Sequence, residues 1–529
     1  MSYTTLTFLF FLLATGILYF ALPKKLQWPV LLAASLGFFA LWCGKLIWMP
    51  AVAAFVIYAA ALYIQRTDRN FRELLKGAEP SEKKSLKKKR DRRKKAAAAG
   101  AVIMLLAGLV AAKYMGFFGD VVNSLAAFFG KGHPIPVFHI LMPLGISYYT
   151  LMAISYVADV YRGTVKAEKN PFMLMLFLCY FPHIVEGPFD RYEPLCRQFR
   201  EPHYLDYEKI RDGGIRFVWG LFKKFVIADR AALIAAPVFA EPDSFGGTAL
   251  LAGGIFFTLQ IYADFSGCMD MVRGVSHMLG IEIAENFRRP FFAVSIEDFW
   301  RRWHITLGHW LRDYVFYSVS LSKHFRKVSE KTAKYISSQR VKELLPAAYA
   351  LFFVWLCNGL WHGAGWKYIF YGLYYYILMM AGRAAAPAFD AAAAALKVDR
   401  EGRGFHIFRV FRTCLIVCFG MIIFRSETLS KAWDMTAGIA AGLFSAPFPE
   451  GTDMFTGFGA EDMVVLLAAS AILLTVSVME ERGREPLKLL TGRPVFIRWP
   501  LYMCLLFSVI ILGVYGGNHT SMAFIYAEF

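Results

Sequence analysis

Charged side chains are scarce in this chain. Only 19% of its 529 residues are Asp, Glu, Lys or Arg, whereas 57% are apolar and 16% are aromatic. A water-soluble protein is typically about 25% charged and about 45–50% apolar. The shortage of charge therefore excludes a soluble multidomain enzyme and a disordered chain, and it predicts one membrane-embedded body.

Acidic residues are the scarcer of the two signs, with 40 Asp and Glu against 58 Lys and Arg. Half of the resulting excess of +18 lies in residues 66–95, which hold 14 basic and 5 acidic residues. Basic residues beside membrane helices mark the cytoplasmic side. We therefore predict that 66–95 is a partly helical cytoplasmic loop. Three spans precede it, so the N-terminus is expected outside, and nucleic acid is not an expected partner.

Cysteine is also sparse, and several catalytic motifs are missing. The eight cysteines are scattered and form no CxxC pair, so the sequence predicts neither a zinc site nor a disulfide framework. There is no GxSxG elbow, no P-loop and no HExxH. His304 and His309 are five residues apart, a poor spacing for one metal on a regular helix. We predict no metal and no bound cofactor.

Long hydrophobic runs, in contrast, are abundant. Because about 20 apolar residues are needed to cross about 30 Å of hydrocarbon, the runs predict an all-α polytopic membrane protein with about 11–14 spans. The segment 431–445 is too short to assign. The candidate spans are 5–22, 28–44, 48–64, 97–117, 138–160, 171–187, 212–236, 247–263, 343–361, 365–383, 405–425, 461–479 and 498–516.

Two stretches do not resemble simple spans. Residues 264–342 mix charged with aromatic side chains, and such a segment at membrane depth has to be buried in protein or line a water-filled cavity. Residues 186–200 contain Pro188 and Pro194, and we expect these prolines to prevent a helix there.

The first candidate site is the segment Phe299-Trp-Arg-Arg-Trp-His-Ile-Thr-Leu-Gly-His-Trp-Leu-Arg-Asp-Tyr-Val-Phe. Read as a helix, it places Trp300 and His304 on one face and Trp303 and Trp310 on another. Such a helix has no surface suited to lipid. It either lies at the membrane interface, anchored by Trp and Arg, or packs inside the bundle.

The second candidate site is His362, in the segment Asn358-Gly-Leu-Trp-His-Gly-Ala-Gly-Trp between two apolar runs. An ionisable group at membrane depth is costly and suggests function. The neighbouring glycines allow another backbone or a ligand to approach, and Asn358, one turn earlier, is placed to orient the ring. The alternative is a buried histidine whose hydrogen bonds are satisfied by a neighbouring carbonyl. The functional interpretation is a general base that activates a hydroxyl or moves a proton.

Short motifs occur in a fixed order over roughly 140–385: Met142-Pro-Leu-Gly-Ile-Ser-Tyr-Tyr-Thr, Phe181-Pro-His-Ile-Val-Glu-Gly-Pro, Lys223-Lys-Phe-Val-Ile-Ala-Asp-Arg, Tyr262-Ala-Asp-Phe-Ser-Gly, Glu285-Asn-Phe-Arg-Arg-Pro-Phe, Arg301-Arg-Trp-His-Ile-Thr-Leu, Trp310-Leu-Arg-Asp-Tyr and Gly359-Leu-Trp-His-Gly. Together they resemble the membrane-bound O-acyltransferase (MBOAT) family, in particular its bacterial polysaccharide-modifying branch.

The resemblance implies an MBOAT-type helix bundle with a central funnel, re-entrant or interfacial helices, and two histidines at the narrow point. It implies that His362 is the catalytic base and that His304 is its companion. The acyl donor would be a cytoplasmic thioester, either acetyl-CoA or an acyl-carrier protein. For Arg312, a structural pair with Asp313 is the alternative to substrate binding. The substrate-binding side chains would be Trp303, Arg302, Arg312, Asp313, Asn358 and Trp361.

The resemblance also carries a domain organisation and a location. We predict one integral-membrane acyltransferase domain over 1–529, in the bacterial inner (plasma) membrane. Besides the lipid bilayer and the acyl donor, the expected partner is an extracytoplasmic SGNH-type acyltransferase. The parts of the domain are N-terminal spans at 1–64, the basic loop 66–95, a catalytic core at 140–385 and C-terminal spans at 405–529.

The motifs leave more than one function open. O-acetylation of a cell-surface polysaccharide is favoured, although Tyr317-Ser-Val-Ser-Leu-Ser-Lys replaces the Pro-Leu-Gly-Gly-type turn of the alginate-specific members. D-alanyl transfer to teichoic acid is the first alternative, because Gly187-Pro-Phe-Asp-Arg-Tyr is more similar to that branch. A proton-coupled transporter or flippase is the alternative from another class. The chain shows none of the internal repeats common in transporters. The intact histidines argue against an inactive scaffold.

Overall fold

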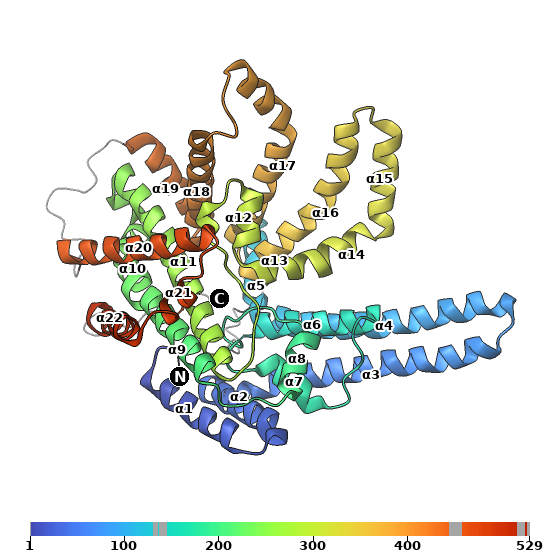
Figure 1. Ribbon diagram of the computed structural model, residues 1–529. Helices are drawn as coiled ribbons and strands as arrows, with labels where there is room; N and C mark the ends of the chain where they lie inside the picture. Colours follow the sequence, from blue (N-terminus) through green and yellow to red (C-terminus); the bar gives the residue numbers. More distant parts are fainter. Residues whose placement is uncertain (1, 131–135, 137–144, 444–457, 516–523, 526–529) are drawn as a thin grey trace. The chain divides into compact units, whose positions relative to one another are not determined.

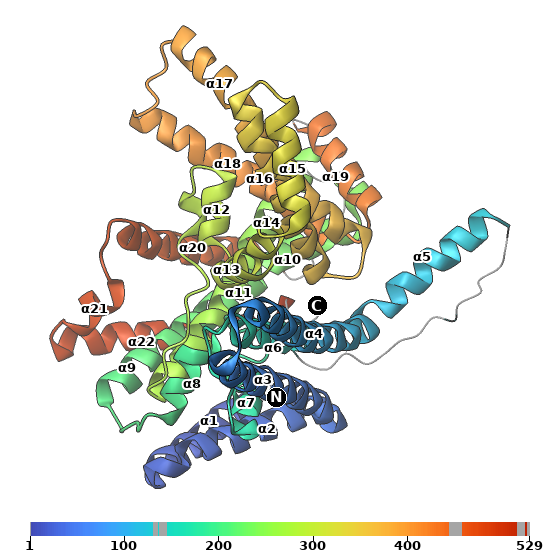
Figure 2. The ribbon, with the colours of Figure 1, turned by 90° about the vertical axis from the view of Figure 1, so that its right-hand side faces the viewer.

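The computed structural model describes residues 2–130, 136, 145–443, 458–515 and 524–525 (Figures 1 and 2). Within these ranges the regular structure is helical, and the sole β-type pairing is an isolated bridge between Phe287 and Trp303. The predicted fold class, an all-α polytopic membrane protein, is confirmed.

Eight helices in the described part of the chain are long and apolar enough to cross a membrane. Two shorter apolar helices are α1 (Leu6–Ala21) and α5 (Met115–Phe128). The predicted span 365–383 is helical from Trp366 onward as well, but it is not among the eight. These eight are Lys24–Cys43, which includes α2 (Gln27–Cys43), α3 (Trp48–Gly77), α4 (Pro80–Lys113), α11 (Gly247–Met278), α16 (Gln339–His362), α18 (Arg403–Arg425), α20 (Ala460–Glu481) and α22 (Val495–Leu512).

The chain forms two compact units. The first consists of Met1–Gly214 and Val272–Ala284, and the second of Ile215–Met271 and Glu285–Phe529. In addition to the helices above, the first unit contains η1 (Lys24–Leu26), η2 (Gly44–Ile47), α6 (Ile146–Arg162), α7 (Pro171–Cys179), α8 (Tyr192–Arg200) and the start of α9 (Tyr207–Leu221).

The basic segment 66–95 lies in the first unit, where α3 and α4 run side by side (Figures 1 and 2). The segment is helical on both sides of a break before Pro80, which suits the first turn of α4 because that position needs no hydrogen-bond donor. Asp68 of α3 pairs with Lys94 of α4 at 3.1 Å. The predicted partial helicity is confirmed.

In the first unit the structure differs from the sequence-based prediction at two segments, and a third lies partly outside the described residues. The span 171–187 is wrong: α7 ends at Cys179, and the loop that follows is apolar because it is buried within the protein. The prediction that residues 186–200 form no helix is also wrong, because Tyr192–Arg200 form α8. There Pro194 lies in the first turn, where the missing N–H has no intrahelical acceptor to serve. In the span 138–160, residues 137–144 lie outside the described residues, and α6 follows at Ile146.

The second unit holds both candidate sites. Its helix α19 covers residues 431–442 of the segment 431–445 that was too short to assign, and residues 444–445 lie outside the described residues. Besides those already given, its elements are η3 (Phe222–Ala228), α10 (Asp229–Ala240), η4 (Pro242–Ser244), η5 (Pro290–Phe292), α12 (Ile296–Arg302), α13 (Ile305–Trp310), η6 (Leu311–Phe316), α14 (Tyr317–Ser320), α15 (Lys323–Tyr335), α17 (Trp366–Ala395), α19 (Leu429–Gly442) and α21 (Pro486–Thr491).

Charges on α11 are neutralised inside the second unit. Lys224 donates to Asp264 at 2.7 Å and also pairs with Asp229 at 2.9 Å, while Lys223 pairs with Asp270 at 2.5 Å. Asp264 is 1% exposed. Asp264 therefore agrees with the prediction that charges in 264–342 are buried in protein or line a water-filled cavity, whereas the side chains of Arg288 and Arg301 are exposed. The pairing explains why α11 continues beyond the predicted span end at residue 263.

Candidate active site

The helical conformation is interrupted at His304. Helix α12 ends at Arg302, His304 adopts φ +48°, and α13 begins at Ile305, so the continuous helix read from the sequence is wrong. Residues 286–288 lie antiparallel to this interruption and form hydrogen bonds with the backbone on both sides of it. Arg288 N donates to Arg302 O at 2.9 Å, and Ile305 N donates to the Asn286 backbone carbonyl at 3.0 Å. A left-handed residue other than glycine costs roughly 1–2 kcal/mol. The two hydrogen bonds to residues 286–288 hold His304 in that conformation.

The side chain of Asn286 fixes the tautomer of His304. Asn286 Oδ1 accepts from Thr306 N at 3.1 Å and from Thr306 Oγ1 at 2.9 Å, and it lies 3.3 Å from His304 Nδ1. A backbone N–H only donates, so the amide atom facing it is the oxygen. His304 Nδ1 must then carry the proton and donate to Asn286. In the neutral ring, Nε2 holds the lone pair.

His304 is 3% exposed, and this burial lowers the pKa of its imidazole to about 3. Burial disfavours the charged form of a histidine, so the ring is neutral at physiological pH. Phe265 packs against the ring edge-to-face, with centroids 4.9 Å apart. The neutral ring, with its proton on Nδ1, presents Nε2 as a hydrogen-bond acceptor.

His362 is the last residue of α16 and is 2% exposed. Its ring packs edge-to-face against Tyr371 of α17 at 5.5 Å and against Phe424 of α18 at 5.4 Å. The crossing of α16 and α17 sets its position. A Cβ at Gly359 would lie 2.3 Å from the carbonyl oxygen of Tyr368, so only glycine fits there. The predicted close approach of another backbone is confirmed at Gly359.

Gly359→Ala is therefore expected to destabilise the protein. The new methyl group has to push α17 away, and overpacking of this kind costs about 1–3 kcal/mol. The displacement also moves His362, so acyl transfer should fall with stability. Thermal unfolding in detergent measures the first effect. Gly382→Ala on α17, where nothing lies within 4 Å of the new Cβ, is the matched control and should unfold like the wild type.

One indole contacts both histidines. The Trp361 ring lies 5.3 Å from the His304 ring and 4.9 Å from the His362 ring, measured between centroids. His304 reaches this indole from the break between α12 and α13, and His362 from the end of α16. The structure thus brings the two predicted histidines to one aromatic side chain, although 58 positions separate them in the chain.

The two predicted arginines occupy different surroundings. Arg302 donates from Nε to Asp298 at 3.1 Å, and its Nη1 bonds both carboxylate oxygens of Glu481 at 3.1 Å. Arg289 joins the same carboxylate at 2.8 Å. Arg312 is half-exposed and pairs with its neighbour Asp313 at 2.9 Å. The pairing of Arg312 with Asp313, the structural alternative to a substrate contact, is present.

Two further predicted residues are buried. Trp303 is 1% exposed and stacks on Phe299 at 5.4 Å, and its Nε1 has no hydrogen-bond partner among the described residues. Asn358 is 4% exposed, and within the same part of the chain its Oδ1 also lacks a partner. Substrate binding by these residues stays a prediction.

Asn286 and Glu481 were not predicted as site residues from the sequence. Asn286 belongs to the quoted motif that begins at Glu285, and its short amide next to charged and aromatic residues was the available signal. Glu481 lies at the end of α20, 179 positions beyond Arg302. Nothing local in the sequence connects that pair. Among the residues that the structure describes, no group of three or more His, Cys, Asp or Glu is placed to hold a metal.

Comparison with known proteins addresses the family directly. The sequence profile of the MBOAT, membrane-bound O-acyltransferase family matches residues 166–332. A protein of Helicobacter pylori named "Peptidoglycan O-acetyltransferase" is 30% identical over 423 residues, which are 73% of this chain and 71% of that protein. The chain belongs to the membrane-bound O-acyltransferase family.

Two other relatives differ in their named substrate. A protein of Azotobacter vinelandii named "Probable alginate O-acetylase AlgI" is 37% identical over 328 residues, which are 62% of this chain and 59% of that protein. A "Teichoic acid D-alanyltransferase" of Bacillus subtilis is 29% identical over 325 residues, or 59% of this chain and 78% of that protein. The match thus spans less than two thirds of the length of the alginate O-acetylase.

Proposed function

We propose that the protein is a membrane O-acyltransferase that passes an acetyl group from a cytoplasmic thioester donor to a cell-surface polysaccharide. The observation that carries the proposal is the arrangement of two buried histidines on one indole, inside a multi-pass member of this family. A thioester is already activated. The enzyme therefore has to orient the reactants, remove the hydroxyl proton and stabilise the oxyanion.

The proposed roles follow from the surroundings of each ring. His362 takes the proton as the hydroxyl oxygen attacks the thioester carbonyl, and it returns a proton to the leaving thiolate. His304, neutral and fixed by Asn286, orients the reacting groups through Nε2. Glu481 and Asp298 hold Arg302 beside this segment, which favours a positioning role for that arginine over a direct contact with the donor.

The finer assignment is acetyl transfer, supported by relatives named for O-acetylation at 37% and 30% identity against 29% for the one named for D-alanyl transfer. Acetyl-CoA or an acyl-carrier thioester is the donor in this proposal, and an extracytoplasmic SGNH-type acyltransferase is the partner. We place the protein in the bacterial inner membrane, as a single acyltransferase domain with residues 140–385 as its catalytic core.

Purified protein in liposomes tests the proposed function. The thioester donor is supplied on one side, and acyl groups that appear on the other side or on added polysaccharide are counted. We expect acetyl transfer from a thioester and little D-alanyl transfer. D-alanyl transfer alone would reassign the branch. Movement of intact substrate without cleavage of the thioester would replace the proposal by a transporter, the alternative from another class.

Topology provides a second test. We place the segment 66–95 on the cytoplasmic side, because its 14 basic residues favour that side. Leu86→Cys should react with a membrane-impermeant maleimide only after the cells are permeabilised. Wild-type protein, with its eight native cysteines, serves as the background control. Labelling at position 86 in intact cells would invert the proposed orientation.

A further inference from the structure

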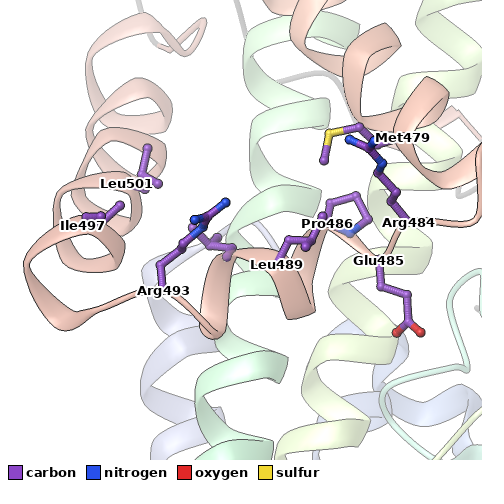
Figure 3. A pocket seen from close by; sticks show the side chains of 9 residues that line it. Met479, Arg484, Glu485, Pro486, Leu489, Arg493, Ile497 and Leu501 are labelled. Atoms are coloured by element: carbon purple, nitrogen blue, oxygen red, sulfur yellow. The ribbon is translucent and has the colours of Figure 1, made fainter.

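A groove of about 500 Å³ opens among α20, α21 and α22 of the second unit (Figure 3). This volume lies within the range of about 300–1,000 Å³ found for small-molecule sites. Apolar side chains form one part of its lining and two arginines another. The residues that matter here are Arg484, Arg493, Pro486, Leu489, Ile497 and Leu501.

The two arginines are available to bind an anion. Figure 3 shows Pro486 and Leu489 between Arg484 and Arg493. Neither guanidinium forms an ion pair or a hydrogen bond with any residue that the structure describes. The remaining charged residue of the lining, Glu485, pairs with Lys488 at 2.7 Å, and its carboxylate points away from both arginines. Residues 482–498 carry five basic residues and one acidic residue.

The groove lies where two membrane helices end. Helix α20 stops at Glu481 and α22 starts at Val495, and both are among the eight helices able to span a bilayer. Trp499, in the second turn of α22, is 48% exposed. Tryptophan concentrates at the level of the lipid headgroups. The arginines are thus near the phosphate layer, and the exposed side chains of Ile497 and Leu501 continue along α22 from that level.

We propose that this groove binds one anionic phospholipid. The headgroup phosphate lies between Arg484 and Arg493, and an acyl chain follows Leu489, Ile497 and Leu501. Arginine forms charge-assisted hydrogen bonds to phosphate, and the net negative charge of the lipid complements a segment rich in basic residues. A zwitterionic lipid lacks this net charge, and a free phosphate ion cannot use the apolar wall. The proposal does not depend on the proposed acyl transfer.

Native mass spectrometry of the full-length protein in a neutral detergent tests the proposal. The probes are phosphatidylglycerol, phosphatidylcholine with the same chains, and inorganic phosphate as a competitor. Wild type should retain one phosphatidylglycerol molecule in preference to phosphatidylcholine. A basic residue near the surface contributes about fivefold in affinity, so Arg484→Gln/Arg493→Gln should bind phosphatidylglycerol about thirtyfold more weakly.

The matched control is Arg326→Gln/Lys327→Gln, which removes two exposed charges from α15 outside the groove and should bind like the wild type. Arg484→Lys/Arg493→Lys keeps both charges and should retain most of the affinity, which separates loss of charge from loss of folding. Equal retention of phosphatidylcholine would overturn the proposal. Wild-type binding by the Gln pair, or full displacement of the lipid by inorganic phosphate, would overturn it as well.

Discussion

His362→Ala is expected to lower acyl transfer by about 10²–10⁴-fold, the usual effect of losing a positioned general base. His362 is buried at the end of α16, with its ring against Trp361, Tyr371 and Phe424. No other residue on α16 brings an imidazole to this place. The rate of acyl-ester formation by purified protein, at saturating thioester, measures the loss.

The same substitution should leave folding largely intact. The ring lies at the C-terminal end of α16, beside Gly363, so removing it does not change the backbone hydrogen bonds of the helix. Size-exclusion behaviour and the melting temperature are the controls. If His362→Ala retained wild-type transfer, the proton would have to leave through another group, and His304 would become the candidate base. If it lost its fold together with its activity, the two effects would be separated by His362→Gln.

Asn286→Ala should give the second-largest loss, about tenfold to a hundredfold in kcat. The variant removes the acceptor of His304 Nδ1 and of the Thr306 backbone N–H together. Leaving a buried donor without its partner costs about 1–3 kcal/mol, and each 1.36 kcal/mol lost from transition-state stabilisation is a factor of ten in rate. His304 would also be free to adopt the other tautomer.

Asn286→Asp is the informative companion variant, because it keeps both hydrogen bonds but adds a negative charge beside the ring. A nearby negative charge favours protonated imidazole and raises the pKa of His304. Wild-type His304 stays neutral as pH falls, since its pKa is about 3. In the Asp variant protonation begins at a higher pH, so the acid limb of the kcat–pH profile should move upward. If Asn286→Ala kept the wild-type kcat and Asn286→Asp left the pH profile unchanged, the role of Asn286 in positioning His304 would be contradicted.

The fold was predictable from the sequence where hydrophobic length decided it. The runs at 48–64, 405–425 and 461–479 correspond to α3, α18 and α20. The length of an apolar run predicted a false span where the run is buried in protein instead of lipid, as in the loop after Cys179. The same criterion ended a predicted span too early where ion pairs allow a charged helix to continue, as α11 does past Asp264. A single sequence does not distinguish these environments, because burial in protein and burial in lipid select the same side chains.

The candidate site was predictable through its histidines but not through their surroundings. Two ionisable residues in Gly- and Trp-containing interruptions of apolar runs are visible in the sequence. The break at His304 is not, because it depends on pairing with residues 286–288. The fixed tautomer depends on Asn286 in the same way. The position of Arg302 depends on Glu481 from a distant helix. These contacts are tertiary, so they cannot be predicted from the periodicity of the sequence.

A single-turnover comparison of wild type with His362→Gln tests the central claim most directly. Glutamine retains hydrogen-bonding capacity at this position but does not take up a proton near neutral pH. Both proteins are loaded with a labelled acetyl thioester, the polysaccharide acceptor is added, and thioester cleavage is followed together with acetyl-ester formation. The account predicts that both proteins bind the donor and that only wild type forms the ester at an appreciable rate. Ester formation by His362→Gln at the wild-type rate would contradict the assignment of His362 as the base.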